Sequence, residues 1–582
     1  MIRPGISFII IFFLVSSITF SQIISSIELN GNKAFNEKDY LKWSSISKGT
    51  KIYDGICDSI KQNILKTLFE QGYYNSEVEV KLYSIDSLNT KLIINVNENE
   101  PAYISFIKYN YDEIDSLFLS KSFSELIGNI FSRSLIEQTF DNILHYYENN
   151  GFPFASIKIN SVYFYRDTLL NRNNVKIDII IEREKRYSIN RIEIDGNSKT
   201  KDYVVLRELG VNIGDIYNQK KIDQITNRLN KLNYFEQIEK PFFYLNNKKE
   251  GVLKIAIKEK VTNNFDGLIG YVPGQEKEKG FFTGFLNLSF RNLFGTGRAA
   301  LIRWQKENRK TQEFELQYKE PWLFSLPINL SGNIFQRVQD TTYTQNNYGI
   351  NLEYLVSDEL SASIIFNNQS TIPFERFNKV FTVYNSFSTT IGIIFKIDSR
   401  DNYYSPRRGI LLSNSYKYSM KKINGPKDYI TQQMKTNHEL KRLEIDFEFY
   451  KEIFLEQIVA LKTYVRELTG TEIEISDMYL LGGTKTLRGY REKQFSGNRV
   501  IWSNIEYRYL LTDKSYAFIF LDSGYFTTSG NSNMTKSEDF KIGYGFGMNI
   551  ETGIGLLGVS FALGKGDSFS NGKIHFGIIS EF

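Results

Sequence analysis

The sequence predicts three small α+β modules in tandem, followed by an all-β transmembrane barrel of about 16 antiparallel strands. Two observations predict this order: a repeat of about 80 residues in the N-terminal part, and alternation of side-chain type beyond Lys260. A fixed period indicates an array of similar units, and alternating strands joined by short and long connections in turn are typical of outer-membrane barrels. Composition agrees, because 37 Tyr and 45 Phe bring the aromatic content to 15%, and such residues favour strands and membrane interfaces.

Composition also argues against several function classes. The 71 basic and 66 acidic residues nearly balance, so the sequence carries no nucleic-acid footprint and we expect no nucleic-acid partner. Cys57 is the only cysteine, which excludes an internal disulfide and favours a buried, inert thiol. The three histidines, His145, His438 and His575, are scattered, so we expect no metal site. Without a Gly-x-Ser-x-Gly elbow or a Cys/His pair, we expect no catalytic residues, no cofactor and no enzyme.

Residues 1–21 are predicted to be a secretory signal peptide. Arg3 supplies the positive start, Ile9 to Val15 the apolar core, and Thr19 to Ser21 a tolerable cleavage site. An uncleaved membrane anchor is the alternative, although the apolar run is short for a spanning helix. After residue 21 there is no stretch of 18 apolar residues, so any further membrane span has to be a β-barrel.

The N-terminal repeat has two recognisable elements. The first, Ile27 to Asn32, reappears as Ile192 to Asn197, each a short strand running into an Asn-Gly or Asp-Gly turn that needs positive φ. The second follows a helix, as Gly72-Tyr73-Tyr74 and again as Gly151-Phe152-Pro153-Phe154. The third copy of this element, Asn233-Tyr234-Phe235, has lost the glycine. Each copy predicts a small α+β unit with helices on one face of its sheet.

Such a unit leaves a sheet edge to which an extended peptide can add as a further strand. Three structural spacers are the alternative, and the pattern alone does not choose between spacing and client binding.

The region from 261 to 582 predicts the barrel. From Lys541 to Glu551, large apolar residues alternate with glycine and polar residues, as in transmembrane strands with one lipid-facing side. Short connections alternate with longer ones, which disfavours a soluble sandwich and matches a barrel with short periplasmic turns. The last strand, Ile574 to Phe582, alternates and ends on an aromatic residue. The candidate strands start near residues 264, 281, 297, 311, 327, 343, 358, 387, 409, 438, 454, 499, 515, 540, 553 and 573.

The longest connection, residues 466–498, has no clear strand or helix period. Insertions of this length are uncommon in compact folds and are often functional. Three glycines and two large side chains around a single arginine indicate a backbone that turns sharply and packs against something. The residues singled out are Gly482, Gly483, Leu487, Arg488, Gly489 and Tyr490.

The repeated modules resemble POTRA domains, polypeptide-transport-associated modules. On that basis we expect POTRA 1 at 22–97, POTRA 2 at 98–184 and POTRA 3 at 185–260, followed by the barrel at 261–582. The middle copy opens differently, at Ala102 to Phe106, so its boundaries are the least defined by the repeat.

The whole mature chain resembles the BamA/TamA superfamily of outer-membrane assembly and translocation proteins. Three POTRA modules are most similar to its TamA-like branch. Four stretches carry the resemblance: a first periplasmic turn, a mid-barrel turn with strand start, a lumenal loop motif, and the strand that faces this loop. Their residues are Asn292, Gly295 and Gly297; Asp398, Arg400, Asp401, Pro406, Arg408 and Gly409; Leu487 to Tyr490; and Asp522 and Gly524.

The resemblance implies roles for these residues. The long loop would fold into the lumen as a plug, and Arg488 would pair there with Asp522. An arginine–carboxylate pair can be bidentate, and removing one partner of a desolvated pair leaves a costly unpaired charge. A solvated loop arginine and a hydrated lumenal aspartate are the alternatives from sequence alone. Phe576, Ile578 and Phe582 resemble the C-terminal signal by which outer-membrane barrels are recognised.

The implied function is assembly or insertion of outer-membrane proteins, with clients captured by the POTRA modules in the periplasm. The implied partners are unfolded outer-membrane or secreted client proteins, outer-membrane lipids, and a periplasmic or inner-membrane partner at the POTRA array. A two-partner-type secretion transporter is the alternative, although such transporters usually have two POTRA modules and an N-terminal plug helix. A porin would not carry about 240 residues before its barrel.

Overall fold

The computed structural model divides the chain into two compact units. One comprises the residues up to 189 together with 214–220, and the other comprises 190–213 together with 221–582. The predicted signal peptide lies outside the described residues. The structure describes residues 22–110, 115–272, 280–306, 308–339, 342–374, 383–402, 405–528, 536–552 and 555–579.

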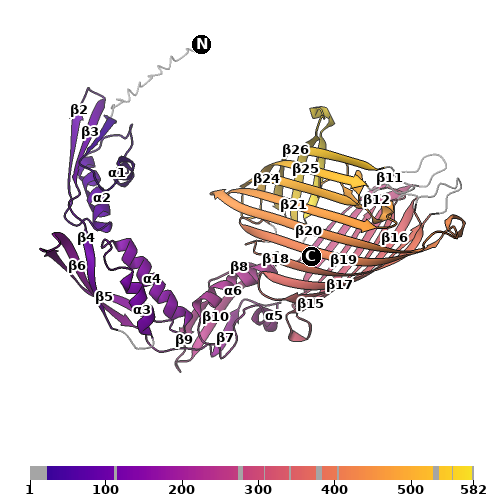
Figure 1. Cartoon of the computed structure of the whole chain (residues 1–582), viewed down its shortest axis with the longest axis horizontal. Coiled ribbons are helices and arrows are strands. Elements are labelled where there is room, and N and C mark those ends of the chain that lie inside the picture. Colours follow the sequence, from indigo (N-terminus) through magenta and orange to yellow (C-terminus); the bar gives the residue numbers. More distant parts are fainter. Residues whose placement is uncertain are drawn as a thin grey trace, which may run out of the picture. The chain divides into compact units, whose positions relative to one another are not determined.

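The first unit contains two α+β modules, each with a three-stranded sheet and helices beside it (Figure 1). In module 1 the sheet order is β1-β3-β2, with β1 parallel and β2 antiparallel to β3. Module 2 repeats this plan as β4-β6-β5. Module 1 consists of β1 (Ile23–Asn30), α1 (Glu37–Ser44), α2 (Ile56–Glu70), β2 (Glu77–Ser84) and β3 (Asn89–Asn97). Module 2 consists of β4 (Ala102–Tyr109), α3 (Ser116–Ser124), α4 (Arg133–Asn149), β5 (Ser156–Asp167) and β6 (Arg172–Glu182).

Residue spacing explains the core of module 1. Helix α2 buries apolar residues at every fourth position, and β3 buries every second residue, so the helix stripe and one face of the strand meet. The buried set is Ile56, Ile60, Ile64 and Leu68 from the helix and Leu92, Ile94 and Val96 from the strand.

The repeated Gly-Asn turn has the same contacts in both of its copies. Gly31 and Gly196 have φ of +85° and +96°. A Cβ atom on Gly31 would lie 2.1 Å from the Val96 carbonyl oxygen, and one on Gly196 would lie 1.9 Å from that of Ile257. Glycine is therefore required both for the backbone angle and for this close approach.

A carboxylate closes each of these turns. Glu98 accepts hydrogen bonds from the backbone N–H groups of Lys33 and Ala34, at 2.9 and 2.7 Å. Glu259 does the same for Lys199 and Thr200, at 2.9 and 2.6 Å. The turn and the end of the last strand of the module are thereby fixed together.

The second repeated element forms the joint between modules 1 and 2. The carbonyl oxygen of Gly72 accepts a hydrogen bond from the Ala102 N–H at 3.1 Å. The Tyr74 hydroxyl donates to the Phe131 carbonyl oxygen at 2.8 Å, and the two rings stack at 5.5 Å. Burial raises the pKa of Tyr74 to about 12, so the hydroxyl stays a neutral donor.

The later copies of this element have equivalent contacts. The Gly151 carbonyl oxygen accepts a hydrogen bond from the Tyr187 N–H at 2.8 Å. In the third copy Asn233 replaces glycine but keeps positive φ, at +57°, a conformation that asparagine tolerates. The buried Tyr234 hydroxyl then donates to the Gly297 carbonyl oxygen at 3.1 Å, in a turn of the barrel. The loss of the glycine therefore accompanies a change of neighbour, from another module to the barrel.

The second unit contains module 3 and the barrel. In module 3 the central strand β10 pairs with β7 on one side and with the two short strands β8 and β9 on the other. Helix α6 buries Ile222, Ile225 and Leu229 at helical spacing. The elements of module 3 are β7 (Arg191–Asp195), α5 (Asp202–Leu206), α6 (Gln219–Leu232), β8 (Phe235–Ile238), β9 (Phe242–Leu245) and β10 (Gly251–Glu259).

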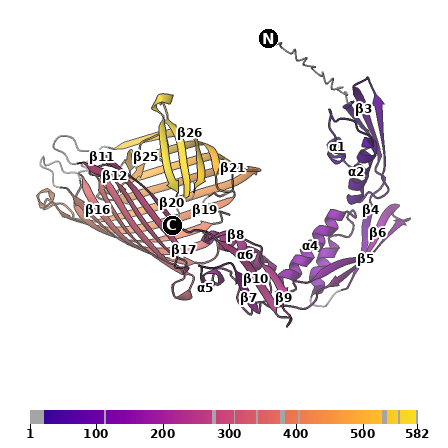
Figure 2. The ribbon, with the colours of Figure 1, turned by 180° about the vertical axis from the view of Figure 1, so that it is seen from behind.

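The barrel is a 16-stranded sheet in which each strand pairs antiparallel with its neighbour, from β11 to β28 (Figures 1 and 2). Among the described residues no pairing joins β28 back to β11. The strands are β11 (Asn263–Val272), β12 (Phe281–Leu293), β13 (Arg298–Lys306), β14 (Gln312–Glu320), β15 (Ile328–Gln339), β16 (Tyr343–Leu355), β17 (Leu360–Pro373), β18 (Asn385–Asp398), β19 (Gly409–Gly425), β20 (Asn437–Phe454), β21 (Gln457–Gly470), β24 (Arg499–Leu510), β25 (Tyr516–Thr528), β26 (Ser537–Thr552), β27 (Gly555–Gly564) and β28 (Lys573–Ile579).

The predicted fold class is confirmed: three modules precede a barrel of 16 strands in the described chain. Strand β21 runs to Gly470, so the long loop begins at residue 471 rather than 466. It also contains short structure that the sequence pattern does not indicate, namely η4 (Ile475–Asp477), β22 (Tyr479–Leu481) and β23 (Phe495–Gly497). The module boundaries stay predictions. None of the helices in the described part of the chain is long and apolar enough to cross a membrane.

Substitution of Gly31 by alanine is expected to destabilise module 1 far more than substitution of Gly49. Both glycines have similar φ, +85° and +93°, but a Cβ on Gly49 meets nothing within 4 Å. The left-handed backbone alone costs alanine about 1–2 kcal/mol, and the contact with the Val96 carbonyl adds about 1–3 kcal/mol of overpacking. Pulse proteolysis of the full chain in urea measures both. Equal losses would show that the Val96 contact does not matter.

Candidate functional site

The long loop, residues 471–498, lies against the inner face of the barrel. Its polar groups bond to inward-facing side chains of strands far apart around the sheet, among them Gln345 of β16, Lys421 of β19 and Asn504 of β24. Strands β22 and β23 pair with each other as a small hairpin within the loop. The loop is therefore bonded to the inner face of the barrel wall at several strands.

Arg488 is held by two carboxylates. Its Nε and Nη2 atoms donate to the two oxygens of Asp522, each at 2.8 Å, and its backbone N–H donates to the same group at 3.0 Å. Its Nη1 atom pairs with Glu506 at 2.9 Å. The guanidinium also lies over the Phe520 ring, 3.6 Å from the ring centre. Since Arg488 is 7% exposed and Asp522 is fully buried, this is a desolvated bidentate pair with little screening.

Two glycines allow the loop to reach this depth. Gly489 has φ of +91°, and a Cβ atom there would lie 2.7 Å from the Leu563 carbonyl group. On β26, a Cβ atom at Gly543 would lie 1.9 Å from the Arg488 carbonyl oxygen. Gly543 thus lets the loop backbone pack directly on β26. The Tyr490 hydroxyl donates to the Ile542 carbonyl oxygen at 3.0 Å and fixes the far side of the turn.

The rest of the predicted motif packs around the ion pair. Leu487 is fully buried, and Gly524 of β25 faces it, where a Cβ atom would lie 3.2 Å from Leu487. Gly482 and Gly483 both have positive φ and form the turn that precedes the arginine. All six loop residues and both β25 residues that the sequence singles out therefore lie in one cluster.

The loop also bonds to the last strand, which sequence reasoning missed. The Gly489 N–H donates to His575 Nε2 of β28 at 3.1 Å, and the Thr484 hydroxyl lies 3.4 Å from His575 Nδ1. His575 occupies an inward position of an alternating strand, which the sequence pattern predicts. Its contact depends on the path of the loop, for which the sequence offers no signal.

Three further ion pairs hold the loop at its ends. Lys421 of β19 is buried and pairs with Glu474 and with Asp477, the latter at 2.5 Å. At the other end, Lys493 pairs with Glu313 of β14 at 2.5 Å. These residues, like Glu506, were not singled out from the sequence. The available signal was a charge at an inward position of an otherwise apolar strand, which is a feature of any water-filled barrel as well.

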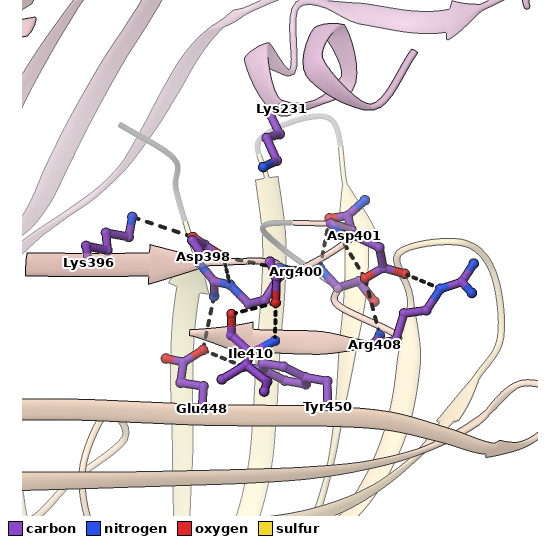
Figure 3. Close-up of polar contacts among 12 residues, drawn as sticks. Lys231, Lys396, Asp398, Arg400, Asp401, Arg408, Ile410, Glu448 and Tyr450 are labelled. Atoms are coloured by element: carbon purple, nitrogen blue, oxygen red, sulfur yellow. Dashed lines mark hydrogen bonds and ion pairs between the residues drawn. The ribbon is translucent and has the colours of Figure 1, made fainter. Parts of the chain in front are cut away.

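The mid-barrel turn motif forms a second buried network, drawn in Figure 3. Arg400 donates to both oxygens of Asp398 at 2.8 Å and to Glu448 of β20 at 3.0 Å. Tyr450 donates to the same Glu448 at 2.7 Å. The ion pair between Arg400 and Glu448 fastens the turn between β18 and β19 to the wall of the barrel.

The exposed part of the same turn is held differently. The Asp401 carboxylate accepts backbone hydrogen bonds from Asn402, Arg407 and Arg408, at 2.9 to 3.3 Å. The Arg408 side chain lies 3.9 Å from this carboxylate and is 82% exposed. Pro406 precedes it, and Gly409 starts β19 with φ of +111°.

The first turn motif is a docking site for module 3. Asn292 donates to the Thr200 hydroxyl at 2.8 Å and accepts from the Gly297 N–H at 2.9 Å. The Gly295 carbonyl oxygen accepts from the Lys201 N–H at 2.9 Å. A Cβ atom on Gly295 would lie 1.9 Å from the Lys199 carbonyl oxygen, so the contact with module 3 leaves no room for a larger residue there. The contacts give the motif a role that the sequence did not indicate.

Two more turns at this rim contact module 3. Arg228 pairs with Asp358 at 2.6 Å, and Lys231 donates to the Asp358 carbonyl oxygen at 2.7 Å. The Trp322 indole donates to Glu208 at 2.7 Å. Burial raises the pKa of Glu208, because removal from water disfavours the charged form of the carboxylate. Module 3 is therefore joined to three turns at one rim of the barrel.

The C-terminal residues lie partly outside the described chain. Phe576 is 66% exposed on the outer face of β28, as a lipid-facing residue would be. Ile578 pairs with Leu557 in the ladder, and Phe582 lies outside the described residues. In the part of the chain that the structure describes, no group of three His, Cys, Asp or Glu side chains is placed to hold a metal ion.

Comparisons with known proteins follow the same division of the chain. Residues 292–582, half of the chain, match the family model of the Omp85 superfamily domain. Residues 22–99 and 187–260 match the model of the surface antigen variable number repeat, POTRA.

Two curated relatives are named as outer membrane protein assembly factor BamA. The protein from Nitratidesulfovibrio vulgaris is 21% identical over 473 residues, which is 76% of this chain and 56% of that protein. The protein from Neisseria meningitidis serogroup B is 23% identical over 340 residues, 55% of this chain and 40% of that protein. The aligned region thus spans about half of these relatives or less.

Solved structures with a similar arrangement include BamA from Haemophilus ducreyi without POTRA domains 1–3. It has 17% identity and a TM-score of 0.46 over 82% of this chain and 98% of that one. CdiB from Escherichia coli has 11% identity and a TM-score of 0.49, over 89% of this chain and 95% of that one.

Substitution of Asp522 by alanine is expected to destabilise the barrel, because it leaves a buried guanidinium with one carboxylate instead of two. Removal of one partner from a buried pair costs about 3–5 kcal/mol. The temperature of the heat-dependent mobility shift in detergent gels reports this loss. Arg488→Ala combined with Asp522→Ala should be no worse than the more damaging single change, and Ser523→Ala, on the outer face of the same strand, is the control. Strictly additive losses would contradict the pairing.

Substitution of the two arginines of the mid-barrel turn should distinguish the stability contribution of a buried charge from that of an exposed one. Arg400→Ala removes the guanidinium that neutralises Asp398 and Glu448 at the wall, and it leaves Asp398 only the longer ion pair with Lys396, at 3.5 Å. This loss is expected to cost about 3–5 kcal/mol. Arg408→Ala removes an exposed ion pair and should change stability by no more than about 0.5 kcal/mol. The same gel-shift midpoint measures both, and similar values for the two variants would refute the assigned network.

Proposed function

The chain belongs to the Omp85 superfamily, and we propose that it is a non-enzymatic factor that assembles proteins in the outer membrane. The observation that carries the proposal is the joining of three α+β modules, of which the first and third match the POTRA model, to a barrel of this family. The two curated relatives described above are named for the same activity. The barrel lies in the outer membrane and the POTRA modules lie in the periplasm.

The modules capture clients before they reach the barrel. Each has a small sheet with helices on one face, and such sheets can accept an extended segment as an additional strand. Main-chain hydrogen bonds supply the affinity in this binding mode, so many client sequences can be accepted. The clients are unfolded outer-membrane proteins, and the lipids of the outer membrane surround the step that follows.

The barrel then supports folding and insertion at its seam. In the described residues β28 and β11 form no ladder with each other, so each presents backbone groups that only another strand can satisfy in lipid. A client strand that pairs with one of these edges exchanges an unfavourable exposed backbone for a ladder. The seam is therefore the place where an incoming chain gains most by forming a hairpin.

The lumenal loop stabilises the barrel while a client strand pairs at the seam. It bonds to β24 and β25 through Arg488 and to β28 through His575. These contacts support a role in keeping the C-terminal strands in shape beside an unpaired edge. The loop thus stabilises the working barrel and takes no part in covalent chemistry.

Reconstitution in liposomes tests the proposal. An unfolded barrel protein added to vesicles that contain this chain should insert severalfold faster than into empty vesicles, because the seam supplies a strand template. Insertion is scored by protease protection and by the heat-dependent gel shift of the client. Vesicles with Arg488→Ala should lose most of the acceleration, and vesicles with Arg408→Ala should keep it.

The same vesicles distinguish the alternative function. A two-partner secretion transporter would export a soluble polypeptide across the bilayer without accelerating the insertion of a barrel client. Export with no gain in insertion would therefore replace the proposed function by secretion.

A further inference from the structure

A cavity of about 250 Å³ lies inside the barrel, between the long loop and the inner face of the wall. Lys485 and Arg488 of the loop line it, together with Lys462 of β21. The part of the wall that belongs to β27 and β28 consists of small inward residues, which are Gly558, Ser560 and Gly577. Because these residues are small, the last two strands leave a space beside the loop that larger side chains would fill.

The side chains that line this cavity carry more positive than negative charge. Three of them are cationic and one is a carboxylate, namely Lys462, Lys485, Arg488 and Glu506. Next to them, the buried Asp522 and Arg508 contribute one charge of each sign, so the positive excess is unchanged. A cavity with excess positive charge between walls of low dielectric attracts an anion.

The carboxylates around Lys462 are already bonded to other groups. Glu506 and Glu448 are the acidic side chains that act on this lysine. Glu506 is shared by two guanidinium groups, at 2.9 and 2.7 Å, and Glu448 accepts from Arg400 at 3.0 Å and from two tyrosine hydroxyls. The Lys462 ammonium group itself has no ion pair or hydrogen bond among the described residues, although it lines the cavity. Its donors are therefore available to a bound molecule.

Lys485 is in the same situation on the side of the loop. The acidic side chains that act on it are Glu315, Glu492 and Glu313. Glu313 and Glu315 pair with arginines of the wall at 2.8 and 3.2 Å, and Glu492 accepts from the Thr484 N–H and hydroxyl. Within the described chain, Lys485 has neither an ion pair nor a hydrogen bond from its ammonium group. A second free cation thus lines the cavity.

A third donor without a partner lies on β27. Ser560 lines the cavity and is 6% exposed, and its hydroxyl forms no hydrogen bond with any described residue. The great majority of buried polar side chains in folded proteins have a hydrogen-bond partner. An acceptor inside the cavity would supply the missing partner.

We propose that this cavity binds a phosphate group. Lys462, Lys485 and Ser560 donate to its oxygens from three different elements, which are β21, the loop and β27. Acceptor oxygens that point in several directions satisfy donors arranged in this way, and a tetrahedral phosphate has them whereas a planar carboxylate does not. Lysine binds phosphate as a point charge, and such charge-assisted bonds are the stronger ones. The site does not depend on the proposed function.

Occupancy of the site has a structural consequence. The bound phosphate neutralises the excess charge and joins the loop to β21 and to β27. A ligand that binds the folded barrel but not the unfolded chain stabilises the fold. Phosphate therefore fixes the loop beside the last strands of the barrel. The phosphate group is that of a free inorganic ion or of a lipid headgroup, and the two sources need separate measurements.

Equilibrium dialysis of the full-length chain in a maltoside detergent measures the first source, with labelled inorganic phosphate as the probe. We expect saturable binding that sulfate displaces and acetate does not, because only sulfate shares the tetrahedral shape. Retention of labelled phosphatidic acid on the immobilised chain measures the second source, and labelled diacylglycerol, which lacks the phosphate, is its control. Binding of inorganic phosphate supports a free ion, and preference for phosphatidic acid alone supports a headgroup. Binding of neither probe would overturn the proposal.

Variants of the donors connect this binding to the cavity. Lys462→Met and Lys485→Met should each weaken binding at least about tenfold, because each removes a charged hydrogen bond, and Ser560→Ala should weaken it severalfold. Lys451→Met is the matched control, since Lys451 is exposed on β20 and does not line the cavity. Unchanged affinity in both lysine variants, or an equal loss in the control, would refute the site.

The stability of the same variants without phosphate checks that the two lysines are free donors. Neither lysine has an ion pair in the described structure, so Lys462→Met and Lys485→Met should leave the midpoint of the heat-dependent gel shift unchanged or raise it. A lower midpoint in phosphate-free buffer would contradict their assignment as unpaired cations.

Discussion

The fit of the long loop inside the barrel depends on the neutralisation of the Arg488 guanidinium. Arg488 is 7% exposed and meets Asp522 through two parallel hydrogen bonds and Glu506 through a third contact. A buried charge without partners would be too costly to retain, so loop and wall have to be positioned together. The surrounding glycines and Phe520 follow from this requirement, because the guanidinium reaches the carboxylates only if the loop backbone packs directly on β25 and β26. The loop is accordingly part of the core of the barrel.

A second constraint links module 1 to module 2 and module 3 to the barrel. In both of these modules a positive-φ residue and an aromatic residue follow the long helix, and they contact the next element of the chain. In the first copy the follower is a module, reached by the Tyr74 hydroxyl. In the third copy it is the barrel, reached by the Tyr234 hydroxyl, and the glycine has become Asn233. The sequence repeat thus has a physical meaning. The two copies share the residues that form the joint, and they differ in the element that the joint contacts.

Much of the fold could be predicted because strand alternation and loop rhythm are local properties. Each of the 16 predicted strand starts lies within three residues of an observed start. The cluster around Arg488 was predicted through its resemblance to a family and through the chemistry of a charge removed from water. Glu506 and His575 could not be predicted, because alternation places them inside the barrel but only the path of the loop decides which inward group it meets. The docking role of Asn292 likewise depends on module 3, which lies distant in sequence.

The contacts of the loop also indicate which of its bonds to the barrel breaks first when the seam edges separate. The loop bonds to β28 through His575, on one side of the unpaired seam, and to β14 through Lys493 and Glu313, on the other side. Separation of the seam edges therefore strains the loop. A hydrogen bond to a neutral histidine is weaker than charge-assisted bonds to carboxylates, so the contact at β28 breaks first while Arg488 stays in place. In the proposed function, β28 is therefore the strand that loses its contact with the loop first, while Arg488 keeps the loop attached to β24 and β25.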